Sequence, residues 1–344
     1  MAFQDLTPAL VLDALDAVGQ RGDGRVLQLN SYENRVFQVM LEDGSAVVAK
    51  FYRPGRWSNA QIVEEHAFAL ELAAAEVTAV PPLALRAEPH TPGLTLHGEP
   101  PTLACWQAAT GEQRFAVAAR CAGREPELDD PAVLRQIGRF LGRLHSVGQR
   151  QPFLHRQVMN VQTDGERAIA VLLDGAFVAD AERPAWQAAS QQALALLVSA
   201  FEALGPLKTL RLHGDCHIGN VLWRDGAAHV VDLDDAVQGP AVQDLWMLVS
   251  GDAQTMATQL NTMLQGYEQF MEFDDRERTL IEPLRTLRML RHSAWLAARW
   301  GDPTFPLNFP YFGTAAYWSQ QTTQLREQIE LMSFALSRSA AGLG

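Results

Sequence analysis

Hydrophobic and polar residues are arranged along the first third of the chain as expected for a small sheet with flanking helices. Apolar positions recur at helical spacing over residues 7–18 and again over residues 58–76. Between them, the stretch RVFQVMLEDGSAVVAKFY contains two apolar, partly alternating runs separated by Asp43 and Gly44, which predicts a β-hairpin. Short strands are expected over residues 81–104. This part of the chain is therefore predicted to be rich in strands.

Helical periodicity dominates the remainder of the chain. The strongest pattern covers residues 129–148, where Asp130 can cap the start of a helix. The chain after residue 150 shows little pattern and is expected to form a loop, until an alanine-rich helix begins near residue 184 and runs to about residue 204. We predict an α+β fold with two lobes, a strand-rich N-lobe (1–105) and a mostly helical C-lobe (106–344) that contains one polar hairpin.

The composition of the chain indicates which kinds of binding partner and which cellular compartment to expect. The net charge of −12 argues against nucleic acid or an anionic membrane as the main partner, because both require clustered lysines and arginines. No apolar run is long enough for a membrane span, and the N-terminus lacks the basic start of a signal peptide. The three cysteines, Cys105, Cys121 and Cys216, have none of the paired spacings of disulfide or zinc frameworks. We expect a cytoplasmic monomer.

Candidate chemistry concentrates in the stretch LRLHGDCHIGNVLWRDG, residues 210–226, and zinc binding is one interpretation of it. His213, Asp215 and His217 alternate, so on a strand they would share one face and could hold zinc as in a hydrolase. Gly214 and Gly219 favour an irregular loop instead. A zinc-dependent hydrolase therefore stays open as an alternative.

A cysteine nucleophile is a second interpretation of this stretch. Cys216 would need a base within hydrogen-bond reach, and His213 or His217 is close to it in sequence. Neighbours in sequence usually project their side chains apart, so the geometry is unfavourable. The favoured interpretation of Cys216 is a small, semi-buried residue.

Phosphoryl transfer is the third interpretation, and it uses other residues. It needs a carboxylate to accept the proton of the substrate hydroxyl, and amide and carboxylate oxygens to hold Mg²⁺ on the nucleotide phosphates. Asp215, Asn220 and Asp232 are of these types, and a hairpin turning at Asp225 and Gly226 would bring Asn220 and Asp232 together. A strand lysine should accompany them.

Lys50 meets this last requirement. It lies in the strand-like run AVVAKFY. A charged side chain in such a strand either has a partner of opposite charge or lies at the edge of the sheet, where it can extend into water. The helix that follows offers Glu64 and Glu65, either of which could pair with the ammonium so that it meets the nucleotide phosphates.

Two motifs together resemble a known family. LHGDCHIGN and VVDLDDAVQGPAVQDL are similar to the H-G-D-x-x-x-x-N and I-D-[WF]-[DE]…D-L motifs of the aminoglycoside phosphotransferase and choline kinase branch of the protein-kinase-like fold. Further stretches, among them LNSYENRVFQV, VAKFYRPGRW, EEHAFAL and PAVQDLWML, resemble one group within that branch, the bacterial stress response kinase A family. That family implies ATP- and Mg²⁺-dependent phosphorylation of serine and threonine in proteins, in a stress response.

The resemblance implies a role for each matching residue. Asp215 would be the catalytic base, assisted by Asp232, which with Asn220 would bind Mg²⁺. Lys50 would contact the ATP phosphates, paired with Glu65 in preference to Glu64. The loop NSYENR replaces a glycine-rich loop, and Ser31 in it would lie against the phosphates. Asp244 and His213 would support the catalytic loop structurally.

The phosphoryl acceptor and several charged residues stay open. The wider branch is dominated by small-molecule kinases, so an aminoglycoside, choline or homoserine-like alcohol is the alternative acceptor. A catalytically silent nucleotide-binding module is disfavoured, because it has no need of the full set of residues. Asp234 and Asp235 are interpreted as a solvated acidic rim, with a metal or cationic-substrate role as the alternative. The helical stripe Arg285, Arg288 and Arg291 is interpreted as an exposed or acid-paired face.

Overall fold

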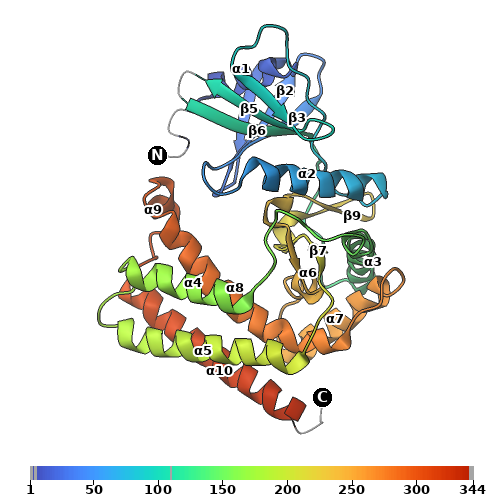
Figure 1. Ribbon diagram of the computed structural model, residues 1–344. Coiled ribbons are helices and arrows are strands. Elements are labelled where there is room, and N and C mark those ends of the chain that lie inside the picture. The colour runs from blue at the N-terminus through green and yellow to red at the C-terminus, as the bar shows by residue number, and fades with distance from the viewer. Residues whose placement is uncertain (1–2, 4–5, 109–110, 341–344) are drawn as a thin grey trace. The chain divides into compact units, whose positions relative to one another are not determined.

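The computed structural model describes residues 3, 6–108 and 111–340, and it has the predicted α+β fold: an antiparallel sheet near the N-terminus and a mostly helical remainder (Figure 1). The chain forms two compact units. The first comprises Met1–Gln157, Leu210–Gln238 and Met247–Phe273, and the second comprises Val158–Thr209, Gly239–Trp246 and Asp274–Gly344. Across the described residues, no helix has the length and apolar character that crossing a bilayer requires.

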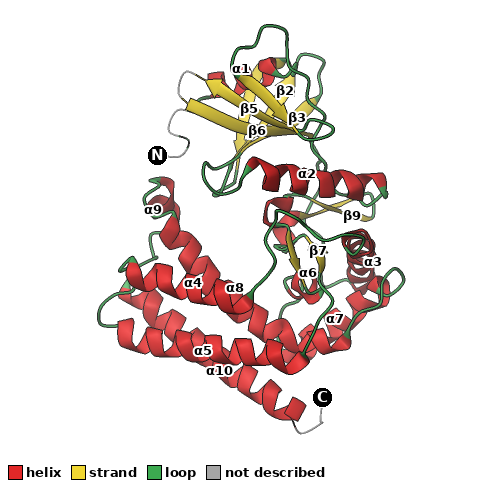
Figure 2. Cartoon of the chain, viewed as in Figure 1, coloured by secondary structure: helices red, strands yellow, loops and turns green. Residues whose placement is uncertain are grey.

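A six-stranded antiparallel sheet forms the N-terminal part of the first unit (Figure 2). Its strand order is β1-β2-β3-β6-β5-β4. The expected hairpin is confirmed, with β2 paired to β3 across residues 42–45. The sheet continues well past residue 105, where the sequence patterns ended the strand-rich part. The strands are β1 (Gly22–Leu29), β2 (Arg35–Leu41), β3 (Ala46–Phe51), β4 (Leu94–His97), β5 (Leu103–Ala108) and β6 (Gly111–Ala119).

Each face of this sheet carries one helix. Helix α1 (Pro8–Ala17) packs into the apolar core that includes Ala49 and Phe51 of β3. Helix α2 (Asn59–Ala74) begins with a capping box formed by Ser58 and Gln61, and contributes to the apolar cluster on residues of β5 and β6. Since side chains alternate along a strand, Lys50 lies on the face opposite the α1 core.

The predicted helix after Asp130 is confirmed as α3 (Pro131–Gly148), with Asp130 accepting a hydrogen bond from the Ala132 amide at 2.7 Å. It packs closely on α7 (Ala253–Tyr267). A Cβ atom at Gly138 would lie 1.8 Å from the carbonyl oxygen of Met263, so this contact requires a residue without a side chain. Helix α3 also packs against β7 (Leu210–Leu212), the strand with which the polar stretch 210–226 begins.

The polar hairpin predicted around Asp225 and Gly226 is confirmed. Both turn residues have left-handed backbone angles, φ 52° and 76°, as a two-residue hairpin turn requires. Its strands β8 (Val221–Arg224) and β9 (Ala227–Val230) pair in register from Val221 opposite Val230. The short elements around it are β7 (Leu210–Leu212), η1 (Ile218–Asn220), η2 (Leu233–Asp235) and β10 (Val237–Gly239).

The second unit is almost entirely helical. The predicted alanine-rich helix is confirmed as α5, but α4 occupies residues that were expected to be a loop. Of the arginine stripe on α8, Arg285 pairs with Glu282 at 3.1 Å and Arg288 and Arg291 are exposed, as interpreted. The helices are α4 (Val161–Asp174), α5 (Arg183–Leu204), α6 (Val242–Trp246), η3 (Asp275–Leu280), α8 (Ile281–Ala298), α9 (Thr304–Asn308) and α10 (Ala315–Ala340).

A buried carboxyl in this unit predicts a pH-dependent stability. The Glu277 side chain accepts a hydrogen bond from the Val242 amide at the start of α6, at 2.8 Å, and burial raises its pKa to about 7. A carboxyl whose pKa is raised on folding stabilises the protein at low pH, and this contribution is lost as the pH rises through 7. We expect wild-type stability to fall by about 2 kcal/mol more than that of Glu277→Gln between about pH 5 and about pH 8. Urea unfolding at the two pH values measures the difference, and equal losses in both proteins would contradict it.

Candidate active site

The polar hairpin brings two of the predicted site residues to adjacent positions. The Val231 amide donates a hydrogen bond to the carbonyl oxygen of Asn220 at 3.1 Å, so Asp232 follows directly after the residue that faces Asn220. The Asn220 side-chain nitrogen, Nδ2, donates to the carbonyl oxygen of Asp215 at 3.0 Å. One short segment therefore holds Asp215, Asn220 and Asp232 around the end of the hairpin.

His213 has a structural position in this segment. It is fully buried, its Nε2 lies 2.9 Å from the Val231 carbonyl oxygen, and its Nδ1 accepts the Asp215 amide at 3.3 Å. Both ring nitrogens are thus engaged by backbone groups, which leaves none to bind zinc. Within the described part of the chain, no three His, Cys, Asp or Glu side chains are grouped so as to hold a metal ion. These observations contradict the zinc-hydrolase alternative.

Cys216 is completely buried beside the catalytic candidates. A nucleophilic thiol must be reached by its substrate and activated as a thiolate, which burial in apolar surroundings disfavours. The favoured interpretation of Cys216 was a small, semi-buried residue, and the structure buries it completely.

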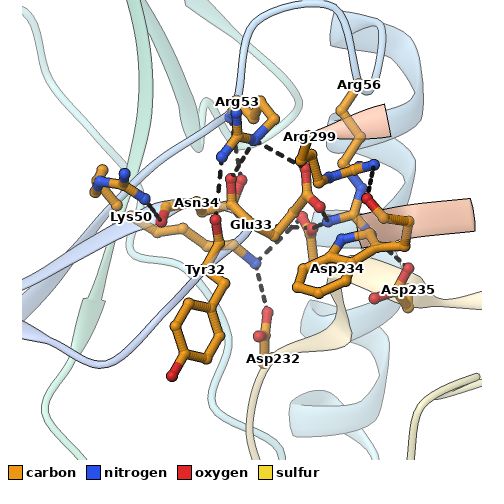
Figure 3. Close-up of polar contacts among 12 residues, drawn as sticks. Tyr32, Glu33, Asn34, Lys50, Arg53, Arg56, Asp232, Asp234, Asp235 and Arg299 are labelled. Carbon is orange, nitrogen blue, oxygen red and sulfur yellow. Dashed lines mark hydrogen bonds and ion pairs between the residues drawn. The ribbon is translucent and has the colours of Figure 1, made fainter. Parts of the chain in front are cut away.

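Lys50 lies between two carboxylates (Figure 3). Its Nζ is 2.7 Å from Oδ1 of Asp232 and 3.3 Å from Oδ1 of Asp234. Burial alone would lower the pKa of Lys50, but these two carboxylates outweigh it and raise the pKa well above its usual value. The ammonium is therefore charged, as a group that neutralises phosphates must be.

The two glutamates expected to pair with Lys50 are placed differently. The Glu64 carboxylate accepts the backbone amides of residues 154–156, at 2.5 to 2.8 Å. Glu65 is buried close enough to Lys50 for the two charges to interact, but no ion pair within 4.0 Å joins them in the described structure, where Lys50 pairs with Asp232 and Asp234. Burial raises the pKa of Glu65 to about 7. The observed partners of Lys50 come from the hairpin end and not from α2.

Asp234 is the centre of a buried polar network that the sequence patterns did not reveal. Its Oδ2 lies 2.8 Å from Arg56 Nη1 and accepts a hydrogen bond from Asn34 Nδ2 at 3.1 Å. Burial would raise the pKa of this carboxyl, but Lys50 and Arg56 lower it below the usual value. With 3% of the residue exposed, the interpretation of Asp234 as a solvated rim is wrong. Asp235, half-exposed and paired with Arg56 Nη2 at 2.5 Å, lies at the edge of the same network.

The loop that replaces a glycine-rich loop is held in one conformation by Arg53. Arg53 donates from Nε to the Glu33 carbonyl oxygen at 2.8 Å and from Nη2 to the Tyr32 carbonyl oxygen at 3.1 Å, and its own amide donates to Asn34 Oδ1 at 3.1 Å (Figure 3). Ser31, the second residue of this loop, is half-buried. Arg53 lies just after the strand that carries Lys50, so these three hydrogen bonds clamp the loop to the end of that strand.

The donor atoms at the hairpin end are suited to a hard cation. Asp232 offers a carboxylate whose side chain is 50% exposed. Asn220 uses its amide nitrogen within the segment, and its side-chain oxygen is the atom type that ligates Mg²⁺. The predicted supporting residue Asp244 lies fully buried in α6 of the second unit.

Comparison with known proteins finds relatives that cover almost the whole chain. Residues 25–302 match the model of the phosphotransferase enzyme family. The chain is 42% identical over 330 residues to stress response kinase A of Salmonella choleraesuis (strain SC-B67), covering 96% of this chain and 94% of that protein. It is equally similar to the serine/threonine protein kinase RdoA of Salmonella typhimurium, and 41% identical over the same length to stress response kinase A of Escherichia coli (strain K12).

Solved structures with this fold are more distant in sequence. A microcompartment-associated aminopropanol kinase superposes with a TM-score of 0.68 at 16% identity, covering 96% of this chain and 98% of that one. The amicoumacin kinase hAmiN, solved with AMP-PNP, Ca²⁺ and Ami, has a TM-score of 0.67 at 17% identity, with coverage of 94% and 92%. At these identities the likeness concerns the fold.

Proposed function

The chain belongs to the phosphotransferase enzyme family, and from this premise we propose that it is an ATP- and Mg²⁺-dependent kinase that phosphorylates serine and threonine residues of proteins. One observation carries the proposal: Asp215, Asn220 and Asp232 meet at the end of one hairpin, with the charged Lys50 2.7 Å from Asp232. A base, two oxygen ligands and a cation for phosphate are the parts that phosphoryl transfer needs.

Each residue has a role in the proposed reaction. The Asp215 carboxylate accepts the proton of the attacking hydroxyl, while the Lys50 ammonium binds the phosphates of ATP and neutralises their charge. Asn220 and Asp232 hold Mg²⁺, which when bound adds further charge neutralisation on the phosphates. Ser31 donates to the phosphates from the clamped loop. Glu65 is proposed as a nearby acidic residue of the nucleotide site, and His213 and Asp244 as structural support.

The acceptor is inferred from the relatives. One of them is called a serine/threonine protein kinase and the others stress response kinases, so we propose a protein acceptor and a role in a stress response. The cysteines Cys105, Cys121 and Cys216 are free, which suits a reducing cytoplasm where ATP is available. The protein is proposed to act there as a monomer.

Transfer of label from γ-labelled ATP tests the proposal. We expect the protein with Mg²⁺ to label serine and threonine of a general protein substrate such as casein, and chelation of the metal to abolish the label. A panel of small alcohols, including choline and an aminoglycoside, is assayed in parallel. Label only on an alcohol would overturn the protein acceptor, and no label on any acceptor would overturn phosphoryl transfer itself.

Cys216→Ala provides a discriminating variant in the same assay. Because the thiol takes no part in the proposed chemistry, we expect its kcat to stay within about threefold of wild type, a barrier change below about 1 kcal/mol. The small cavity left by the sulfur lowers stability modestly. A loss of about a hundredfold or more in a folded Cys216→Ala protein would revive the cysteine nucleophile.

A further inference from the structure

We propose that Asp234, and not a glutamate of α2, is the carboxylate that positions Lys50 for phosphoryl transfer. The inference rests on the proposed function and adds a residue to it. Asp234 would act through Lys50 without touching the substrate, so it is a positioning residue.

The two oxygens of the Asp234 carboxylate have separate tasks. Oδ2 is held by Arg56 at 2.8 Å and by Asn34 at 3.1 Å, and the backbone carbonyl oxygen of the same residue accepts from Arg156 Nη2 at 2.6 Å. Oδ1 is buried, accepts no hydrogen bond within the described structure, and lies 3.3 Å from the Lys50 ammonium. The contacts of Oδ2 thus fix the Asp234 carboxylate, and Oδ1 is left to accept from the Lys50 ammonium.

The other acidic residues near Lys50 are less suited to position its ammonium. Asp232 is the proposed metal ligand and its side chain is half exposed, whereas that of Asp234 is 4% exposed. Glu64 is engaged by the three backbone amides of residues 154–156. Glu65 is buried in α2 and forms no ion pair within 4.0 Å with Lys50 among the described residues, where the ion-pair partners of Lys50 are Asp232 and Asp234. Asp234 is therefore the carboxylate left to hold the lysine.

The same residue also links the lysine to the phosphate-binding loop. Asn34, which donates to Asp234, is the last residue before β2 of the loop that contains Ser31 and is clamped by Arg53. A displacement of the Asp234 carboxylate would consequently move both the ammonium and the loop. This coupling separates Asp234 from a residue that only fills space in the core.

Double-mutant cycles with Lys50→Met test the assignment. In one cycle Asp234→Asn is combined with Lys50→Met, and in the other Glu65→Gln is combined with it. We expect Asp234→Asn alone to lower kcat about thirtyfold, and to have a smaller effect, below about tenfold, when Lys50 is already methionine and only the loop is displaced. Glu65→Gln should change kcat less than about threefold in either background. The exposed turn variant Asp225→Asn serves as the matched acidic control with unchanged kcat.

Urea unfolding of the same variants measures the interaction of Lys50 with each carboxylate in the absence of ATP and metal. The midpoint shifts of Asp234→Asn and Lys50→Met should not add, while those of Glu65→Gln and Lys50→Met should add. Coupling of Lys50 to Glu65 together with additivity toward Asp234 would overturn the inference. If Asp234→Asn does not fold, the Glu65 cycle decides, since additivity supports the inference and coupling overturns it. A wild type that transfers no phosphate, yet shows Lys50–Asp234 coupling in unfolding, would refute the proposed function and leave the pairing standing.

Discussion

Replacing Asp215 by asparagine is expected to lower kcat for phosphoryl transfer about a thousandfold, the middle of the range for a general base. Asparagine has the shape of aspartate but cannot accept the hydroxyl proton. The contact that organises the segment uses the backbone carbonyl oxygen of Asp215, which accepts Asn220 Nδ2 at 3.0 Å and is retained in the variant. The KM for ATP should therefore change little, since the phosphate and metal ligands stay in place.

Steady-state kinetics with labelled ATP measure this prediction, and binding of a fluorescent ATP analogue shows that the nucleotide site is intact. Asp225→Asn is the matched control, because it removes an exposed carboxylate from the same hairpin at a turn position that asparagine tolerates. We expect full activity from the control. An Asp215→Asn protein that keeps more than about a tenth of the wild-type kcat would show that another group takes the proton.

The parts of the fold that were predictable from sequence are those with strong local signals. Helix α3 has a capping aspartate, a proline in its first turn and a single apolar stripe. The β8–β9 hairpin is determined by two turn residues, Asp225 and Gly226, whose backbone angles few other residue pairs adopt. Local physical chemistry is sufficient for such elements.

Helix α4 and strand β6 are absent from the sequence predictions because their signals are weaker or depend on distant partners. Two of the four residues that helix α4 buries are small, Gly165 and Ala168, and the polar run of residues 162–167 conceals its periodicity. Its spacing of Gly165, Ala168, Ile169 and Leu172 is helical, and Asn160 caps it, so a pattern was present. Strand β6 pairs with β3, which lies about seventy residues earlier in the chain, and such a contact leaves no local trace.

In the candidate site, too, contacts within one segment could be predicted from the sequence, whereas contacts between distant segments could not. Asp215 and Asn220 lie five residues apart in one segment, and their common position could be expected from the sequence. The partner of Lys50 could not, because Asp232 is 182 residues away and Asp234 is buried by folding. An acidic pair after Asp232 has the composition of a solvated rim, and the contacts that hold Asp234 inside, with Lys50, Arg56 and Asn34, form only on folding.

Replacing Asp232 by asparagine is expected to lower kcat at ordinary Mg²⁺ concentration about a thousandfold or more, because phosphoryl transfer depends above all on electrostatic stabilisation of the phosphates. Asparagine is the appropriate substitute, since residue 232 has a left-handed backbone with φ 61° that asparagine adopts more readily than alanine. Lys50 retains its contact with Asp234 at 3.3 Å, so the variant should fold. The loss of kcat would then result from removal of the proposed metal ligand and not from unfolding of the site.

Titration with Mg²⁺ separates this loss from that of Asp215→Asn. If Asp232 binds the metal, the Asp232→Asn protein should need a higher Mg²⁺ concentration for half-maximal rate, whereas the Asp215→Asn protein should keep the wild-type requirement at its much lower rate. Circular dichroism and the urea midpoint confirm that both variants are folded. An Asp232→Asn protein with an unchanged Mg²⁺ requirement and a wild-type kcat would show that Asp232 does not bind the metal. Asn220 could then no longer be proposed as a metal ligand, because that proposal rests on its position beside Asp232 at the end of the hairpin.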